Sequence, residues 1–154
     1  MEYSHWDLRY LELARLVAGW SKDPSTQVGA VVVRPDNSVA SLGYNGFPRG
    51  IVDAPERYED RDTKYSYIVH AEMNAVLSAH TNVRGCTLYT WPLLSCDRCS
   101  VHMIQAGLVR VVAPTCPPDK VERWEPILAK SRSRFDEAGV LWQEIPYDLF
   151  EETK

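Results

Sequence analysis

The sequence lacks the features that mark membrane, secreted and nucleic-acid-coating proteins. It has no run of about 18 apolar residues, so we expect no membrane span. Its first residues contain neither a basic stretch nor the apolar core of a signal peptide, so we expect a cytoplasmic protein. Lysine and arginine are not clustered and the formal net charge is −4, whereas a large nucleic-acid footprint needs a basic stripe. These absences favour a small-molecule partner over nucleic acid or a membrane.

The cysteines are not spaced like those of a disulfide framework. The chain has 154 residues and 4 cysteines, of which Cys96 and Cys99 have the spacing of a metal site. Such usage fits a reducing compartment. We interpret Cys86 and Cys116 as ordinary thiols. The length suffices for one domain with its own core, and no repeat or linker interrupts it, so residues 1–154 are expected to form a single domain.

The residues with the clearest chemistry are His70 and Glu72, followed by Cys96 and Cys99. One imidazole and two thiolates can hold Zn²⁺ and leave its fourth position open, as a catalytic zinc site requires. Water in that position has its pKa lowered from 15.7 to about 7. Because Glu72 is not needed as a ligand, it is free to move protons, and we predict it as the catalytic general acid and base.

The spacing of these four residues also predicts their local geometry. Residues two apart within a helix point in nearly opposite directions, so His70 and Glu72 can share a site only where a helix begins. Cys96 and Cys99 lie three apart and share one face of a first turn, where a helix N-terminus stabilises thiolates. We therefore expect two helices whose N-termini are directed at one Zn²⁺. A redox pair is the alternative for the two cysteines, but it has no need of the upstream histidine and glutamate.

The N-terminal region predicts a helix that faces the core. Ser4 and Asp7 have the spacing of a capping box, and apolar residues then recur at helical intervals. The residues expected on the buried face of this helix are Trp6, Tyr10, Leu13, Val17 and Trp20.

The rest of the chain predicts a hairpin followed by alternating helices and strands, which is typical of a mixed sheet flanked by helices in an α/β fold. Residues 43–62 contain three glycines, two prolines and mixed charge and are expected to form a long loop. The expected strands cover residues 28–33, 38–42, 86–90, 109–113 and 140–145. Three later helices are expected. One begins at His70, one begins at Cys96, and one covers residues 121–138.

A family resemblance rests on five blocks and on the C-x-x-C motif at residues 96–99. The blocks are residues 21–30, 43–50, 63–67, 70–75 and 104–107. With them the chain resembles the deoxycytidylate (dCMP) deaminases of the zinc-dependent cytidine deaminase superfamily. The H-A-E and C-x-x-C motifs match the whole superfamily, whereas the blocks at residues 21–30 and 43–50 are specific to the dCMP branch. The resemblance implies a three-layer αβα cytidine-deaminase-like fold with a five-stranded mixed sheet, Zn²⁺ as the cofactor, and hydrolysis of dCMP to dUMP and ammonia.

The segment before Cys96 departs from the family pattern. The family usually has five residues between a strand tyrosine and the first cysteine, and the last of them is proline. Here residues 90–95 intervene, and Ser95 occupies the position of the proline. The resemblance implies that this segment forms the pocket wall over the base, so a modified cytosine stays open as a substrate.

Substrate contacts and partners follow from the resemblance more than from spacing. Asn45 is expected to contact the sugar, and Ala71 is expected to contact the substrate as well. Trp91 is a candidate for stacking on the base, with a structural role as the alternative. Lys22 is our candidate for holding a 5′-phosphate, with a solvated side chain as the alternative. The family also implies homo-oligomers, as dimers or hexamers, and dCTP and dTTP as regulators.

Four functions remain to be distinguished. The leading one is a dCMP deaminase, and the second is a deaminase of 5-substituted dCMP, CMP, a nucleoside or a free base. A tRNA- or DNA-editing deaminase is disfavoured by the acidic balance of the chain. A non-catalytic module that binds zinc or senses nucleotides is disfavoured by Glu72, because a structural metal site has no use for that carboxylate.

Overall fold

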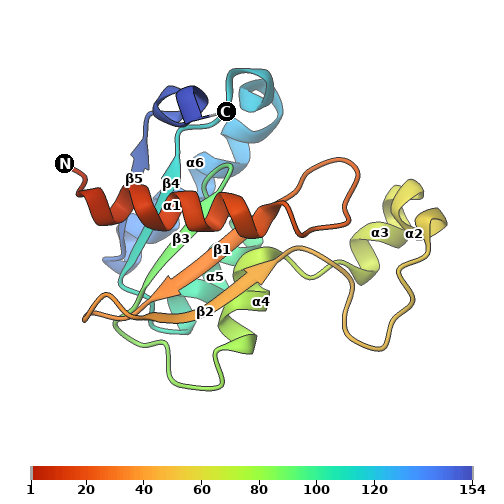
Figure 1. The fold of residues 1–154 in the computed structure, drawn as a ribbon, viewed down its shortest axis with the longest axis horizontal. Coiled ribbons are helices and arrows are strands. Elements are labelled where there is room, and N and C mark those ends of the chain that lie inside the picture. The colour runs from red at the N-terminus through yellow and green to blue at the C-terminus, as the bar shows by residue number, and fades with distance from the viewer. Residues whose placement is uncertain (1, 154) are drawn as a thin grey trace.

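A five-stranded mixed sheet with strand order β2-β1-β3-β4-β5 forms the centre of the fold (Figure 1). The computed structural model describes residues 2–153, with side chains described to residue 151. The strands are β1 (Gly29–Val33), β2 (Val39–Tyr44), β3 (Thr87–Trp91), β4 (Arg110–Pro114) and β5 (Leu141–Ile145). The helices are α1 (His5–Ala18), α2 (Pro55–Glu59), α3 (Arg61–Tyr67), α4 (Ala71–Ser78), α5 (Asp97–Gln105) and α6 (Val121–Ala138), with 3₁₀ turns η1 (Pro118–Lys120) and η2 (Tyr147–Thr153).

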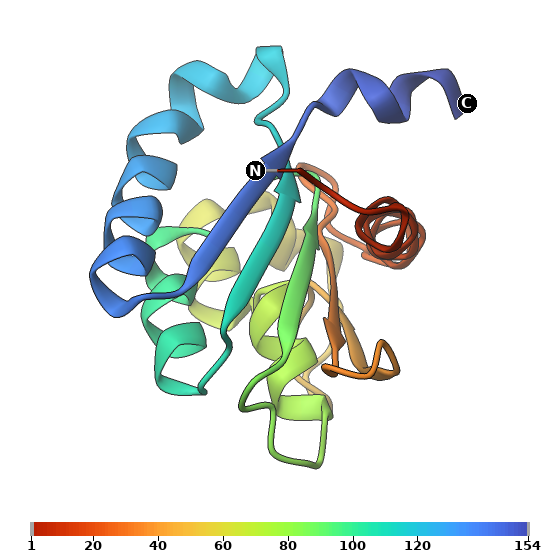
Figure 2. The ribbon, with the colours of Figure 1, turned by 90° about the vertical axis from the view of Figure 1, so that its left-hand side faces the viewer.

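Helices cover both faces of the sheet, as Figure 2 shows with the sheet nearly edge-on. Helix α1 packs on one face against β1 and β3, while α4, α5 and α6 lie on the other. Each interface has its own apolar core, one centred on α1 and one beneath α4 to α6. The predicted three-layer αβα fold with a five-stranded mixed sheet is confirmed. No helix within residues 2–153 is both long and apolar enough to cross a bilayer.

The strand pairings bring the start of β1 and the ends of β2 and β3 together at one end of the sheet. Strand β1 runs antiparallel to both β2 and β3, and β3, β4 and β5 are mutually parallel. Gly29 at the start of β1 therefore pairs with Tyr44 at the end of β2 and with Trp91 at the end of β3. The segments that leave these ends converge on the same place, and the site described below is built there.

The predicted N-terminal helix exists, but its buried face differs from the predicted one. The capping box of Ser4 and Asp7 is present. Tyr10 and Val17 are buried as expected, whereas Trp6 is 38% exposed and Trp20 is 52% exposed. Trp20 lies beyond the end of α1, where the helical period no longer applies. The buried residues of α1 are Asp7, Tyr10, Leu11, Ala14, Val17 and Ala18.

The prediction of a long loop over residues 43–62 is wrong at both of its ends. Strand β2 continues to Tyr44, and the later part of the range forms α2 and the start of α3. Pro55 occupies the first position of α2, where proline suits a helix because its missing N–H has no partner there. The predicted helix over 121–138 is confirmed, with Pro126 inside it.

Helix α4 approaches the sheet unusually closely at Gly43 of β2. A Cβ atom at this position would lie 2.4 Å from the carbonyl oxygen of Ala71 and 2.4 Å from the amide nitrogen of Ala75. The hydroxyl of Ser41 donates a hydrogen bond of 2.6 Å to the carbonyl of Ala75. These contacts fix the position of α4, and with it the N-terminal turn that carries His70 and Glu72.

We expect Gly43→Ala to destabilise the fold by about 1–3 kcal/mol, because the new methyl group must displace backbone atoms of α4. Urea unfolding followed by circular dichroism measures this loss. Gly46→Ala is the matched control, since a Cβ at Gly46 meets nothing within 4 Å. Equal stability of the two variants would contradict the close approach of α4.

Candidate metal centre and substrate pocket

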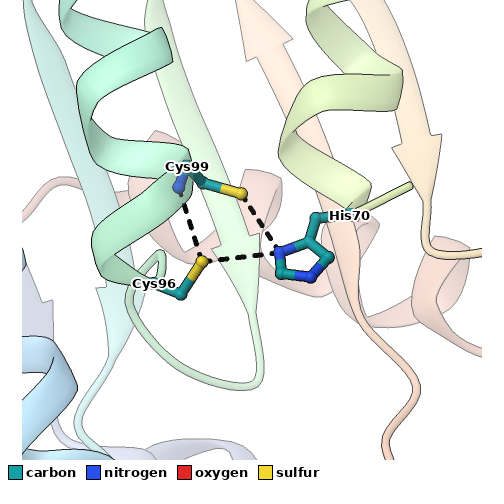
Figure 3. Close-up of side chains that lie close together, drawn as sticks. All are labelled: His70, Cys96 and Cys99. Carbon is teal, nitrogen blue, oxygen red and sulfur yellow. Dashed lines mark hydrogen bonds between the residues drawn. The ribbon is translucent and has the colours of Figure 1, made fainter. Parts of the chain in front are cut away.

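Two helix N-termini meet at one point on the α4–α6 side of the sheet. His70 is the N-cap residue of α4, and Cys96 is the N-cap residue of α5, whose first turn contains Cys99. Figure 3 shows the imidazole of His70 facing both sulfur atoms. The two-helix geometry expected from the spacing is therefore observed. It arises because His70 and Cys96 both have extended backbone conformations that turn the chain into its helix.

The distances among these side chains suit a tetrahedral metal site. His70 Nδ1 lies 3.2 Å from Cys99 Sγ and 3.4 Å from Cys96 Sγ. All three candidate ligand atoms lie within 4.8 Å of one another. Ordinary Zn–N and Zn–S bonds place neighbouring ligand atoms of a tetrahedral site roughly 3.5–3.8 Å apart, only a few tenths of an ångström more. Two thiolates with one imidazole is a donor set that zinc favours, so the residues present fit Zn²⁺.

The two thiols differ in acidity because they interact directly with each other. A hydrogen bond from Cys99 lowers the pKa of the Cys96 thiol to about 4. The same interaction, together with burial, raises the pKa of Cys99. The hydrogen bond to Cys96 raises the pKa of His70. The backbone N–H of Cys99 also donates to Cys96 Sγ at 3.4 Å, so this helix turn stabilises a thiolate before any metal is considered.

Glu72 lies beside this group but outside the set of metal-ligand candidates. The candidate set that the described residues form contains His70, Cys96 and Cys99. Glu72 is only 3% exposed, and burial, aided by the negative charge of Cys96, raises its pKa. A carboxyl group with a raised pKa is suited to both taking up and returning protons near neutral pH.

A pocket connects this centre to the surface. Its lining includes the buried Glu72 together with His70 and Cys96, which we call its inner end, and the exposed Tyr65 of α3 and Arg123 of α6, which we call its outer end. The other lining residues include Ser25, Thr26, Val28, Asn45, Ala71, Thr90, Leu93 and Leu94. Apolar walls with a few polar groups are typical of small-molecule sites. The structure thus brings the three predicted ligands, Glu72, Asn45 and Ala71 together.

Asn45 forms a structural connection as well as lining the pocket. Its side-chain oxygen accepts from the backbone N–H of Val28 at 2.9 Å, and its amide donates to the carbonyl of Thr26 at 2.9 Å and to Asp23 at 3.3 Å. These bonds tie the end of β2 to the loop before β1. A sugar contact by Asn45 stays a prediction.

Asp23 and Lys64 form a largely buried ion pair in the pocket wall. Lys64 Nζ lies 2.8 Å from Asp23 and also donates to the hydroxyl of Ser25 at 2.8 Å. Burial alone would raise the pKa of Asp23, but the hydrogen bonds from Lys64 and the backbone lower it overall. The Lys64 charge is therefore already balanced inside the protein.

The structure does not bring Trp91 to the pocket. Successive residues of a strand point to opposite faces, so Thr90 lines the pocket while Trp91 faces α1. There its ring stacks on Tyr147 at 5.3 Å and contacts Phe150 edge-on at 5.2 Å. Trp91 therefore has the structural role that we named as the alternative to base stacking. The expected pocket wall is present, but it is formed by Thr90, Leu93 and Leu94.

Lys22 is likewise outside the set of residues that line the pocket. Its side chain is 70% exposed and pairs with Asp53 at 3.1 Å, an exposed ion pair of little energetic weight. The prediction that Lys22 holds a phosphate in this pocket is not supported by its position, and it has the solvated role that we named as the alternative.

The lining residues that the sequence analysis did not single out as site residues include Lys64, Tyr65, Arg123 and Trp124. Lys64 and Tyr65 lie in the block at residues 63–67. This block contributes to the family resemblance, but it does not indicate a role for either side chain. The other two lie on α6, where nothing in the local pattern distinguishes them from ordinary helix residues.

Comparison with known proteins agrees with this geometry. Residues 4–115 match the family described as the cytidine and deoxycytidylate deaminase zinc-binding region. The chain belongs to this family. Zn²⁺ is accordingly its cofactor, and the donor set of His70, Cys96 and Cys99 fits that metal.

Two similar deaminase sequences and one similar deaminase structure each match nearly the whole chain. The human deoxycytidylate deaminase is 38% identical over 150 residues, covering 94% of this chain and 82% of its own. An uncharacterized deaminase from the luxG 3′ region of Aliivibrio fischeri is 38% identical over 146 residues, covering 95% and 97%. A crystal structure of dCMP deaminase from the cyanophage S-TIM5, in complex with dCMP and dUMP, shares the fold with a TM-score of 0.70 at 21% identity, covering 94% of this chain and 100% of the other.

We expect one zinc ion per chain in the intact protein and loss of that zinc in Cys99→Ala, because two protein ligands hold Zn²⁺ far less firmly than three. Elemental analysis after gel filtration measures the content. Cys116→Ala is the control, since Cys116 lies outside the candidate ligand set. Full zinc retention in Cys99→Ala would remove Cys99 from that set.

Proposed function

We propose that this protein catalyses the hydrolytic deamination of dCMP to dUMP and ammonia. The observation that supports this most directly is the buried carboxyl of Glu72. It shares a pocket with His70 and Cys96 but lies outside the candidate ligand set that these two residues form with Cys99. A purely structural zinc site would have four protein ligands and no adjacent buried acid. Deoxycytidylate deaminases are 38% identical to this chain over nearly all of its length, which favours dCMP among the possible amines.

In this proposal His70, Cys96 and Cys99 hold the cofactor and Glu72 performs the proton transfers. Bound Zn²⁺ supplies acidity, because it lowers the pKa of water from 15.7 to about 7. Glu72 takes the proton of the water that attacks C4 of the pyrimidine, and it delivers that proton to N3. It then takes the second proton of the same water from the new C4 hydroxyl and gives it to the amino group, which leaves as ammonia. One carboxyl group suffices because it alternates between its charged and neutral forms, which its raised pKa favours.

The pocket walls hold the base close to Glu72 and exclude bulk water. Leu93 and Leu94 supply apolar surface, and the backbone at Ala71 forms the start of α4 beside the ligands. Asn45 is proposed to contact the sugar with the hydrogen-bonding capacity left after its contacts to Val28, Thr26 and Asp23.

The function is tested by measuring ammonia release from zinc-loaded protein with dCMP, 5-methyl-dCMP, CMP, deoxycytidine and cytosine. We expect the highest kcat/KM with dCMP. A higher value for the 5-methyl compound would identify the longer wall at residues 90–95 as a device for modified cytosine. No turnover of any of these compounds would contradict the proposed function.

Glu72→Gln should retain zinc and fold but lose turnover by roughly 10²–10⁴-fold, the usual contribution of general acid–base catalysis. The amide has the same shape as the carboxyl group but cannot accept and return a proton. Steady-state kinetics, with metal analysis on the same sample, separates this effect from metal loss. Near-normal turnover would remove Glu72 from the mechanism.

Several finer statements belong to the same proposal. The family resemblance supports assembly into dimers or hexamers, regulation by dCTP and dTTP near residues 43–50, and a cytoplasmic location. It also supports residues 1–154 acting as one deaminase domain. Analytical ultracentrifugation and assays with each triphosphate test the first two.

A further inference from the structure

We propose that Arg123, aided by Tyr65, binds the 5′-phosphate of the nucleotide substrate at the mouth of the pocket. The inference rests on the proposed function and deepens it by assigning the group that selects a nucleotide over a nucleoside. It comes from the charge balance of the pocket and from contacts between α3 and α6, outside the metal centre. Arg123 also lies outside residues 4–115, the part of the chain that matches the family.

Arg123 occupies the outer end of the pocket. It is exposed to solvent, yet it lines the pocket whose inner end contains His70 and Glu72. It also lines an adjoining open groove that is formed by α3, the start of α4, α5 and α6 and that reaches the candidate metal ligands. A group at this junction lies where the part of a substrate farthest from the metal centre would be held.

Arg123 is the pocket cation whose charge is left unbalanced. The other lining cation, Lys64, is paired with Asp23 at 2.8 Å and donates also to Ser25. Among the ion pairs formed by residues 2–151, none involves Arg123. A phosphate monoester therefore finds one guanidinium here that need not give up a carboxylate partner, and guanidinium groups bind phosphate with two parallel hydrogen bonds.

Neighbouring rings hold the guanidinium in place. Arg123 Nη2 donates to the hydroxyl of Tyr65 at 3.1 Å, and its guanidinium lies 5.4 Å from the ring centre of Trp124. Arginine has five N–H donors, so the bond to Tyr65 leaves most of them for an anion. Because the Tyr65 oxygen accepts from Arg123, its own O–H can donate to the same phosphate. The two residues thus present donors from α6 and α3 to one position.

The test compares nucleotide and nucleoside in wild-type protein and in Arg123→Ala. We expect kcat/KM for dCMP to fall about tenfold or more, mainly through a higher KM, while the value for deoxycytidine stays the same. A purely structural role would lower both values together. Arg123→Lys should restore part of the preference, since it keeps the charge but loses the two-pronged geometry.

Arg61→Ala is the matched control. Arg61 is also exposed and contacts an aromatic ring, that of Tyr65 at 5.3 Å, but it lines only the adjoining groove. We expect its ratio of dCMP to deoxycytidine activity to equal that of the wild type. An unchanged ratio in Arg123→Ala, or an equal loss in Arg61→Ala, would overturn the assignment of Arg123.

Calorimetric binding of dUMP and deoxyuridine to the zinc-loaded protein separates this inference from the proposed function. Arg123→Ala should weaken binding of dUMP about tenfold and leave binding of deoxyuridine unchanged, whether or not dCMP is turned over. Failure of wild-type protein to deaminate dCMP would refute the proposed function alone. Equal dUMP affinity in wild type and variant would refute the role of Arg123 alone.

Discussion

The site depends on the placement of two helix N-termini on one face of the sheet. Helix α4 can start where it does only because Gly43 lets its backbone touch β2. Helix α5 starts where the chain returns from the end of β3 and is packed against α4 and α6. Each helix contributes candidate ligands from its cap or first turn, so a shift of either helix by about an ångström would separate His70 from Cys96 and Cys99. The metal chemistry is thus a consequence of how closely the helices pack.

The same arrangement explains how acid and ligand roles are divided among adjacent residues. His70 precedes the first turn of α4 and Glu72 lies inside that turn. Both line the pocket, but only the imidazole joins the two sulfur atoms in the candidate ligand set. Burial raises the pKa of the Glu72 carboxyl. A three-residue stretch of sequence thus supplies a candidate metal ligand and a candidate proton carrier.

Features that depend on neighbouring residues could be predicted from the sequence. Features that depend on contacts between distant segments could not. The candidate ligands and Glu72 follow from spacing within single helix turns, and the strand at residues 29–33 follows from a β-branched run. Trp91 was open to two roles because both faces of β3 are buried, so no alternation of apolar and polar residues shows which face lines the pocket. Lys22 and Arg123 differ only in tertiary surroundings: one meets Asp53 in solvent, and the other meets Tyr65 across the pocket mouth. Such contacts between distant segments leave no local pattern.

The position of Trp91 has a consequence for how the pocket wall can vary. The segment from residue 92 to 95 is fixed at one end by the rings around Trp91 and at the other by the cap of α5 at Cys96. One anchor belongs to the packing on the α1 side of the sheet, and the other belongs to the candidate metal centre. A change of sequence or length between residues 92 and 95 can therefore alter the pocket wall while both of its anchors stay where they are. Selectivity for the base and the chemistry at the metal are free to diverge independently.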